Sequence, residues 1–431
     1  MSKFAYLIIG NSAGAVGCVE AVREVDKEGS LALVSEEAHH VYSRALIPYY
    51  LDGKIDRAGM DYRPPDFYEK YGVTPFLGKA AVGVDFTRKE VALAGGERLG
   101  YGKLLLATGG RPFLPPLSGL NKGNVFTFLS LNDVLGIEKA LPGAKNAVIL
   151  GGGVIGLMAA EVCKKKGLDV CVLELAERVL APVVDETASA LVENLFRENG
   201  VEISTKTTIK EIHGEDTVRG VTLTDGRMIP ADLLIVAVGV VPRVELVKGT
   251  GIKINRGIVV DQRMQTSVPD VYACGDCAEA YDFVTGTSRL LPLWPNAYVG
   301  GRIAGCNMAG RPREYTWGTG MNATHFFGVY IINAGVNVTR ENAGEYTVIS
   351  RLDKDKEKAV YRKFALQDGR IRGFILVGEV ARAGILLKLM REKIDVRGIA
   401  QELLENNFGY GNLPEELRWR LLQDDVLLGV V

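Results

Sequence analysis

A run of glycines with G-x-G-x-x-G spacing stands at residues 151–156, where the sequence reads Gly-Gly-Gly-Val-Ile-Gly. A β-rich run ends directly before it and a helical pattern follows. In such a turn the first glycine permits the sharp bend, the second lets a pyrophosphate approach the backbone, and the third lets the helix pack closely. The helix N-terminus adds N–H donors for phosphates. We therefore predict a dinucleotide site at Gly151, Gly153, Val154, Ile155 and Gly156.

The acid at the end of the next strand predicts which dinucleotide binds here. Residues 170–173 form a short apolar run that ends at Glu174. A carboxylate at this place can accept hydrogen bonds from a ribose diol and would repel a 2′-phosphate, which favours NADH over NADPH. Arg178 could weaken that preference, although a solvated arginine is the simpler interpretation. A further strand at 234–238 closes the unit and adds Val238 and Gly239 to the predicted site.

A weaker version of the same pattern opens the chain. Residues 10–15 read Gly-Asn-Ser-Ala-Gly-Ala, with Ser12 in place of the second glycine and Ala15 in place of the third. A strand precedes them, and a helical pattern and a second strand follow, which makes another β-α-β unit. The predicted ribose acceptor is Glu36, with Ser35 and Glu37 as open alternatives. A strand at 104–107 closes this unit and ends at Thr108-Gly109.

A third informative stretch, residues 266–276, ends in Gly275-Asp276 and would place one carboxylate beside the sugar-like chain of a cofactor. Cys274 and Cys277 form a C-x-x-C pair, which can be a redox dithiol or half of a metal site. The sequence contains no second cysteine pair or histidine cluster to accompany it. We therefore predict no metal site and disfavour a redox role for this pair.

The elements that must position these residues belong to two α/β folds and a third region of different pattern. Residues 111–116 are interpreted as a linker between the two folds. After residue 312, runs at 346–351, 359–365 and 371–377 predict an antiparallel meander, with a charged turn at 353–358. Amphipathic helices are predicted at 380–392 and 396–405. The fold class is thus α/β, with two Rossmann-like domains and a C-terminal α+β domain.

Composition limits the classes of function. The chain has 431 residues, a formal net charge of -1 and 47% hydrophobic residues, so a nucleic-acid partner is not favoured. The six cysteines are scattered rather than arranged as a secreted disulfide framework. The N-terminal segment reads as a buried strand and no apolar run approaches the length of a membrane span. We expect a cytoplasmic protein.

Together these motifs resemble the FAD-dependent pyridine nucleotide-disulfide oxidoreductases. The resemblance runs in order through about residues 1–312, and 321–328 resembles the C-terminal interface domain of that family. It implies an FAD domain at 1–112 and 243–312, an NAD domain at 113–242, and an interface domain at 313–431 that makes a homodimer. The matching stretches are 10–15, 101–112, 151–174, 237–242, 266–277, 293–297 and 301–305.

The resemblance also implies which residues bind FAD. Asp276 would meet the flavin ribityl and phosphate region, residues 294–297 would lie by the isoalloxazine, and Arg44 and Arg111 would lie near the pyrophosphate. The full predicted set is Gly10, Ser12, Ala13, Gly14, Ala15, Ser35, Glu36, Arg44, Pro48, Ala81, Ala107, Thr108, Gly109, Arg111, Gly275, Asp276, Trp294, Asn296 and Ala297.

One position departs from a branch of that family. Coenzyme A disulfide reductases and NADH oxidases carry a redox cysteine where this chain has Ala45, with Tyr49 nearby. Without that thiolate the flavin cannot pass electrons to a disulfide. The Tyr-x-Arg pattern at 42–44 is closer to ferredoxin, rubredoxin and nitrite reductase flavoproteins. Ala45 and Tyr49 are therefore the positions of catalytic interest, and Met158 replaces a glutamate common near the nicotinamide.

The function expected from these residues is electron transfer between NADH and an iron–sulfur carrier, such as a ferredoxin or rubredoxin, or a partner redox subunit. Hydride and electron transfer depend on positioning more than on general acid–base groups, which fits a sequence with four histidines. Two alternatives stay open. One is an NADH oxidase or peroxidase that uses oxygen, and the other is an NADH-sensing flavoprotein with little turnover.

Overall fold

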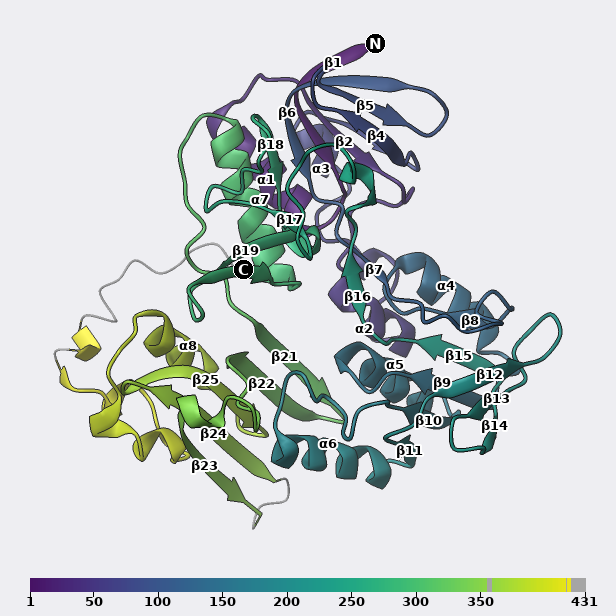
Figure 1. The fold of residues 1–431 in the computed structure, drawn as a ribbon, viewed down its shortest axis with the longest axis vertical. Helices are drawn as coiled ribbons and strands as arrows, with labels where there is room; N and C mark the ends of the chain where they lie inside the picture. The colour runs from purple at the N-terminus through teal and green to yellow at the C-terminus, as the bar shows by residue number, and fades with distance from the viewer. Residues whose placement is uncertain (355–358, 416, 420–431) are drawn as a thin grey trace. The chain divides into compact units, whose positions relative to one another are not determined.

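The computed structural model describes residues 1–354, 359–415 and 417–419 and divides the chain into two compact units (Figure 1). Unit 1 contains residues 1–115, 127–139 and 239–319. Unit 2 contains residues 116–126, 140–238 and the described part of 320–431. Four residues of the predicted charged turn, 355–358, lie outside the described residues, as do 416 and 420–431 of the predicted interface domain.

Unit 1 is built on a sheet whose central strands are parallel. Strand order is β3-β2-β1-β6-β5-β4, and β18 also pairs with β6. Residues 6–9 of β1 are buried, as are all residues of β2, which is the pattern of strands covered on both faces. β4 and β5 extend the sheet as an antiparallel hairpin. The strands are β1 (Ser2–Ile9), β2 (Leu31–Ser35), β3 (Val73–Leu77), β4 (Ala81–Asp85), β5 (Glu90–Leu93), β6 (Arg98–Leu106) and β18 (Val271–Ala273).

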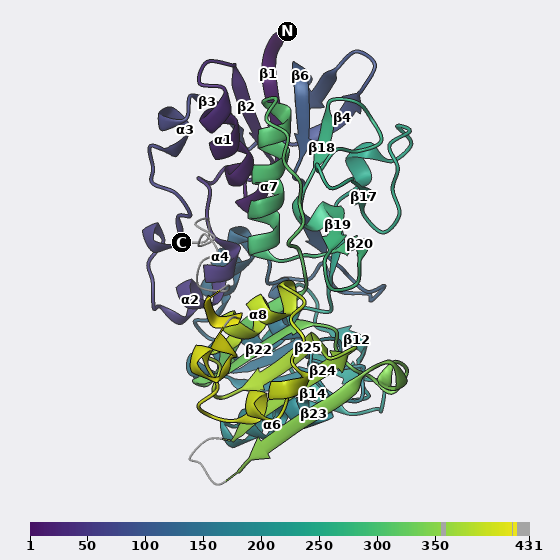
Figure 2. The ribbon, with the colours of Figure 1, turned by 90° about the vertical axis from the view of Figure 1, so that its left-hand side faces the viewer.

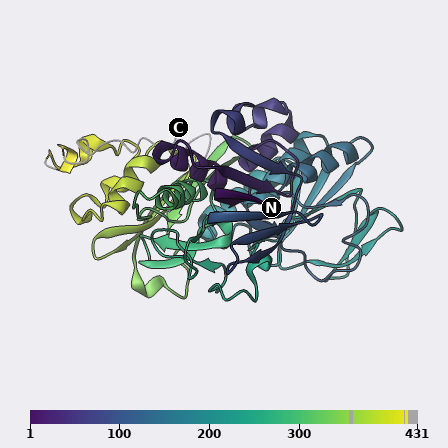
Figure 3. The ribbon, with the colours of Figure 1, turned by 90° about the horizontal axis from the view of Figure 1, so that it is seen from above.

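Two helices of unit 1, α1 (Ala13–Val25) and α7 (Trp294–Met308), lie side by side across this sheet (Figure 2). Figure 3 views α7 nearly end-on. Their backbones approach so closely that only glycine fits at several contacts. A Cβ added at Gly301 would lie 1.9 Å from the Gly14 carbonyl oxygen, and one added at Gly17 would lie 2.3 Å from the Tyr298 carbonyl oxygen. This crossing fixes the N-terminal ends of both helices beside each other.

Smaller elements complete unit 1. The boundary between the two units falls between residues 115 and 116, within the predicted linker at 111–116. The sequence did not predict that Gly110–Pro112 forms β7 and pairs antiparallel with β16 (Val240–Pro242), because this pairing joins segments far apart in the chain. The remaining elements are α2 (Ile47–Asp52), α3 (Phe67–Lys70), α4 (Leu131–Ala140), β17 (Ile258–Val259), β19 (Ala278–Asp282) and β20 (Thr287–Leu290).

Unit 2 contains the second parallel sheet, in the order β11-β10-β9-β15-β8. Helix α5 follows β9 and opens at the glycine turn, as predicted, and α6 follows β10. A three-stranded antiparallel sheet, β12-β13-β14, joins this part of the unit. The bounds are β8 (Val125–Phe126), β9 (Asn146–Leu150), α5 (Val154–Lys165), β10 (Asp169–Leu173), α6 (Glu186–Glu198), β11 (Val201–Ser204), β12 (Ile209–His213), β13 (Gly220–Leu223), β14 (Met228–Pro230) and β15 (Leu233–Val236).

The rest of unit 2 is an antiparallel sheet, the C-terminal sheet, in the order β21-β22-β25-β24-β23. The predicted meander is confirmed as β23, β24 and β25, and the sequence analysis missed the hairpin β21–β22. Helix α8 (Ala383–Arg391) is confirmed. The strands are β21 (Met321–Phe326), β22 (Val329–Gly335), β23 (Thr347–Asp353), β24 (Val360–Gln367) and β25 (Arg370–Val377).

The helix predicted at 396–405 is wrong. The segment holds two short 3-10 helices instead, Arg397–Ile399 and Glu402–Leu404. Over so short a segment, the spacing of apolar residues does not separate the 3.6-residue period of an α-helix from the 3-residue period of a 3-10 helix. The α/β fold class is confirmed by the two parallel sheets. No helix in the described part of the chain is long and apolar enough to cross a membrane.

We expect Gly301→Ala to lower the free energy of unfolding of unit 1 by about 1–3 kcal/mol, because the new methyl group must displace the backbone of α1. Urea unfolding measures the change. Gly384→Ala is the matched control, since that helical glycine has nothing within 4 Å of an added Cβ. Alanine there should be neutral or stabilise by up to about 1 kcal/mol. Equal unfolding midpoints for Gly301→Ala and wild type would contradict the packing described.

Candidate functional site

The glycine turn of unit 2 has the geometry that a dinucleotide fold requires. Gly151 has φ +114°, a backbone conformation that favours glycine, and a Cβ there would lie 2.4 Å from the Ala237 carbonyl oxygen. A Cβ at Gly156 would lie 1.9 Å from the Gly151 carbonyl oxygen. The first and third glycines of the motif are thus required by close backbone contacts between β9, α5 and the segment after β15.

The middle glycine of the motif faces open space. A Cβ built at Gly153 meets nothing within 4 Å. Gly153 is also the N-cap of α5, and no side chain caps this helix end, so Val154 and Ile155 begin a helix whose first N–H groups are not bonded by a capping side chain. Space beside the backbone and uncapped donors at a helix N-terminus fit a pyrophosphate.

Glu174 connects the second strand to this turn. Its Oε2 accepts a hydrogen bond from the Gly152 N–H at 2.7 Å, and its Oε1 accepts one from the Ala176 N–H at 2.8 Å. A carboxylate has about four acceptor positions, so two remain for the hydroxyls of a ribose. Glu174 therefore holds the glycine turn and can still bind a diol.

Val238, Gly239 and Arg178 are the remaining residues considered for this site in the sequence. Val238, which follows β15, is 37% exposed. Gly239, assigned to unit 1, has φ +128° and nothing within 4 Å of an added Cβ. The prediction of a solvated Arg178 is wrong, because its Nη2 lies 3.4 Å from the Ala181 carbonyl oxygen and 3.3 Å from that of Val184. Arg178 is committed to its own loop.

Unit 1 repeats the construction at Gly10. This glycine has φ +129°, and a Cβ there would lie 2.1 Å from the Ala107 carbonyl oxygen. An added Cβ at Gly14 would lie 2.7 Å from the Cys274 Sγ and 3.4 Å from the Ala297 carbonyl oxygen. One at Gly275 would lie 3.3 Å from the Ala297 Cβ. The structure therefore brings together predicted residues from the first turn, the Gly275-Asp276 segment and the start of α7.

The start of α1 lacks a side-chain cap. Ser12 is the N-cap residue, with Ala13, Gly14 and Ala15 in the first turn, and the Ser12 hydroxyl makes no capping bond. Close by in the fold, Thr108 Oγ1 donates to the Arg243 carbonyl at 2.7 Å, and the Gly109 carbonyl accepts from the Arg243 N–H at 2.9 Å. The first-turn N–H groups of α1 are thus arranged as those of α5 are, which fits a second pyrophosphate.

Asp276 has the properties of a carboxylate that needs a ligand. Burial raises the pKa of its carboxyl group, and the positive charge of Arg44 opposes this rise. Among the residues that the structure describes, none donates a hydrogen bond to its side chain. A half-buried carboxylate without protein donors suits the hydroxyl groups of a polyol chain, because hydrogen bonds would offset its desolvation.

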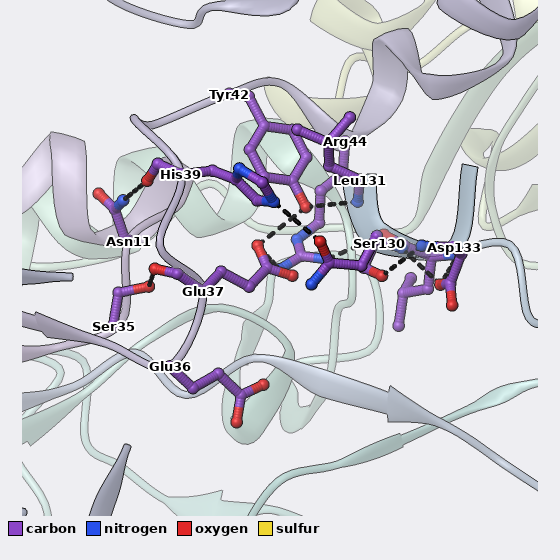
Figure 4. Close-up of polar contacts among 12 residues, drawn as sticks. Asn11, Ser35, Glu36, Glu37, His39, Tyr42, Arg44, Ser130, Leu131 and Asp133 are labelled. Atoms are coloured by element: carbon purple, nitrogen blue, oxygen red, sulfur yellow. Dashed lines mark hydrogen bonds and ion pairs between the residues drawn. The ribbon is translucent and has the colours of Figure 1, made fainter. Parts of the chain in front are cut away.

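The three candidates for the ribose acceptor of unit 1 are separated by their contacts (Figure 4). Ser35 is buried and its hydroxyl donates to the Glu37 carbonyl at 3.0 Å. The Glu37 carboxylate accepts from the Tyr42 hydroxyl at 2.9 Å and pairs with Arg44 at 3.3 Å. Glu36 points to the other side of the chain, where it is half exposed and pairs with Arg243. Of the two carboxylates, that of Glu36 is the more accessible.

Ser130, Leu131 and Asp133 belong to the same polar cluster in Figure 4, and they were not predicted as part of this site. Arg44 Nη1 donates to the Leu129 carbonyl at 2.9 Å, and the Leu131 N–H donates to the Tyr42 hydroxyl at 2.9 Å. Ser130 and Asp133 bond each other's backbone N–H groups at 3.2 and 2.8 Å, at the start of α4. This S-x-x-D pattern is a capping signal that was available in the sequence.

The remaining predicted residues occupy separate elements of unit 1. Arg111 pairs with Glu245 at 2.9 Å. Ala45 is exposed in the 3-10 helix Arg44–Leu46. Pro48 and Tyr49 lie in the first turn of α2, and Ala81 begins β4. The Trp294 ring packs edge-on against Tyr62, with 4.9 Å between the ring centroids. The Asn296 amide donates to the Thr319 carbonyl at 2.9 Å.

Cys274 and Cys277 are core residues. Both are buried and unpaired, and burial raises the pKa of both thiols. The Cys277 thiol donates to the Leu106 carbonyl at 3.4 Å. Since the thiolate is the reactive form, these two thiols are poorly suited to redox exchange.

Comparison with known proteins agrees with this geometry. Residues 4–301 match the pyridine nucleotide-disulphide oxidoreductase family. The chain belongs to that family. Residues 321–394 match the rubredoxin NAD+ reductase C-terminal domain. The chain is accordingly an oxidoreductase, and its cofactors are FAD and NAD(H).

Its relatives include reductases named for rubredoxin and putidaredoxin. The chain is 33% identical over 418 residues to subunit epsilon of the NADH-dependent phenylglyoxylate dehydrogenase of Aromatoleum evansii, with 96% of this chain and 98% of the relative covered. It is 32% identical over 308 residues to the rubredoxin–NAD(+) reductase of Pseudomonas putida, covering 71% and 80%. The solved covalent putidaredoxin reductase–putidaredoxin complex matches with TM-score 0.85 and 27% identity, over 94% of this chain and 96% of that one.

Gly153→Ala should affect NAD+ binding, whereas Gly156→Ala should affect stability. We expect Gly153→Ala to leave thermal unfolding close to wild type and to weaken NAD+ binding about tenfold or more, because the methyl group fills the space left for a pyrophosphate. Gly156→Ala should lower the stability of unit 2 by about 1–3 kcal/mol, because its methyl group meets the Gly151 carbonyl. Calorimetric NAD+ titration and thermal unfolding measure both. Unchanged NAD+ affinity in Gly153→Ala would contradict this assignment.

Proposed function

We propose that this chain passes electrons from NADH to an iron–sulfur carrier, such as a ferredoxin or rubredoxin, without a redox-active cysteine. The observation that carries the proposal is the combination of two complete dinucleotide folds with six cysteines that are all buried and unpaired. Bound FAD supplies the chemistry that links a two-electron hydride donor to one-electron acceptors. The residues of the chain then have only to bind and orient the two dinucleotides.

In unit 2 the proposed NADH site is the turn Gly151–Gly156 with Glu174. The uncapped start of α5 and the open space at Gly153 receive the pyrophosphate, and the free acceptor positions of Glu174 receive the ribose hydroxyls. A second negative charge on a 2′-phosphate would face Glu174, which supports a preference for NADH over NADPH.

In unit 1 the proposed FAD site is the first glycine turn with Glu36, Arg44 and Asp276. Glu36 is proposed for the adenosine ribose and Asp276 for the ribityl chain, whose hydroxyls would supply the donors that its carboxylate lacks. Arg44 is held by Glu37 and Leu129 and reaches Asp276 electrostatically. The rest of the predicted FAD set, including Trp294, is retained as part of this proposal, and Tyr49 is retained as a position of catalytic interest.

Ala45 supports electron transfer directly from the flavin. Its methyl group stands at the place of the thiol used by disulfide-reducing relatives, and it cannot form a disulfide, a sulfenate or a thiolate. The names of the relatives support an iron–sulfur acceptor. The oxygen-using and NADH-sensing alternatives have no residue of this structure that specifically favours them.

A second candidate acceptor is a partner redox subunit. The relative from Aromatoleum evansii is named as one subunit of a larger NADH-dependent dehydrogenase, and the alignment covers 98% of it.

We further propose the three-domain division given above, a homodimer formed through the C-terminal domain, and a cytoplasmic location.

Stopped-flow absorbance tests this proposal. Anaerobic NADH should bleach the bound flavin, and a ferredoxin or rubredoxin mixed in afterwards should restore the flavin colour. Iodoacetamide added after NADH should leave this electron transfer within about twofold of the untreated rate, because buried thiols are poorly accessible to alkylation. The control is a relative that carries the redox cysteine. Iodoacetamide added after NADH should abolish its reduction of disulfides. Loss of electron transfer in the alkylated wild type would contradict the proposal.

A further inference from the structure

The loop at 175–185, which connects Glu174 to α6, contacts the glycine turn of unit 2 directly. The Leu180 N–H donates to the Gly152 carbonyl at 2.9 Å, and the Val179 Cγ1 lies 2.9 Å from where a Gly152 Cβ would stand. Leu180 has φ +55°, a left-handed conformation that is unfavourable for leucine. Such a conformation persists only where surrounding contacts hold it. The contacts that hold this loop therefore also help to fix the position of the glycine turn.

One support comes from strand β24 of the C-terminal sheet and holds Asp185, at the end of the loop. The Tyr361 hydroxyl donates to the Asp185 Oδ2 at 2.6 Å, and the Lys363 Nζ lies 3.0 Å from the same oxygen. The other oxygen, Oδ1, accepts from the Ala188 N–H at 3.0 Å and caps α6. Asp185 thus joins the loop, the first turn of α6 and the C-terminal sheet.

The Asp185–Lys363 pair is buried, with side-chain exposures of 6% and 11%. Burial raises the pKa of Asp185, but the bonds from Tyr361, Ala188 and Lys363 outweigh it and lower the pKa overall. Asp185 is therefore ionised at neutral pH. Removal of one partner would leave a buried charge unpaired, which is strongly unfavourable.

A second support reaches the same loop from the segment after β22. The Asn337 Nδ2 donates to the Val184 carbonyl at 3.3 Å and lies 3.5 Å from the Ala181 carbonyl oxygen. Arg178 approaches the same two carbonyls from within the loop. Two side chains of the C-terminal sheet and Asn337 from the segment after β22 therefore hold residues 181–185. The loop in turn holds Gly152, whose N–H donates to Glu174.

We propose that Asn337, Tyr361 and Lys363 are positioning residues for NADH. They fix the 175–185 loop, and through the Leu180–Gly152 hydrogen bond they fix the turn that Glu174 also holds. The C-terminal domain then sets the affinity of the nucleotide site as well as forming an interface. This inference rests on the proposed function, because it assumes that the nucleotide lies at the glycine turn of unit 2.

Lys363→Gln and Tyr361→Phe test the inference. We expect the Kd for NAD+, measured by calorimetry, to rise at least fivefold in both. The KM for NADH, with ferricyanide as acceptor, should rise by more than kcat falls, because the loop acts on binding. Lys363→Arg should recover most of the affinity, because it keeps the charge facing Asp185. Tyr361→Phe removes only a hydroxyl, so it remains a test if Lys363→Gln does not fold.

Arg362→Gln is the matched control. Arg362 lies between the two test positions on β24 and is buried, but it bonds Asp353 and Asn406 within the C-terminal domain. Successive residues of a strand point to opposite faces, so this variant disturbs the same strand without touching the loop. Its Kd for NAD+ should stay within twofold of wild type.

The outcomes separate the inference from the function on which it rests. If wild type does not bind NAD+, the proposed nucleotide site is wrong. If wild type binds NAD+ and the Lys363 and Tyr361 variants bind it equally well, only the positioning role is wrong. A Kd raised as much by Arg362→Gln as by Lys363→Gln would also overturn the inference, because the effect would then come from general loss of stability.

Discussion

Two backbone contacts, one in each unit, set the geometry on which both dinucleotide sites depend. In unit 1 the Cα of Gly10 lies against the Ala107 carbonyl, and in unit 2 the Cα of Gly151 lies against the Ala237 carbonyl. Each contact joins the end of a first strand to the end of the strand that closes the same unit. An added Cβ would stand 2.1 Å from the first carbonyl oxygen and 2.4 Å from the second, so no other residue type fits. The helices that follow begin where these contacts direct them.

The two proposed sites share this constraint but differ in the segments that complete them. In unit 2 the proposed site consists of the remaining glycines, the uncapped start of α5 and Glu174, next to the 175–185 loop. In unit 1 Ser12 and Ala15 replace the second and third glycines, and the proposed site also includes Asp276 and the start of α7. The glycine-lined crossing of α1 and α7 brings those distant segments to the first turn. The weaker motif is therefore compensated by more extensive tertiary packing.

The sequence predicted what short-range patterns encode. Periodicity and local spacing were enough to predict the strands beside both glycine turns, α5, the meander and the position of Glu174 at a strand end. The prediction of an α-helix at 396–405 was wrong because amphipathic spacing over a short segment does not distinguish an α-helix from 3-10 helices. The contacts of Tyr42 and Arg44 with residues 129–131 escaped prediction because they join segments far apart in the chain. Only the Ser130–Asp133 cap had a local signal that was overlooked.

The central proposal is that electrons pass through the flavin alone. It rests on Ala45, which we propose stands in place of the redox cysteine, and on the burial of the six cysteines. An anaerobic titration of the purified holoenzyme with dithionite, followed by flavin absorbance and by thiol content, tests this most directly. The account predicts that each bound FAD takes up two electrons and that the number of free thiols stays constant. Uptake of four electrons per FAD, with two new thiols, would contradict it.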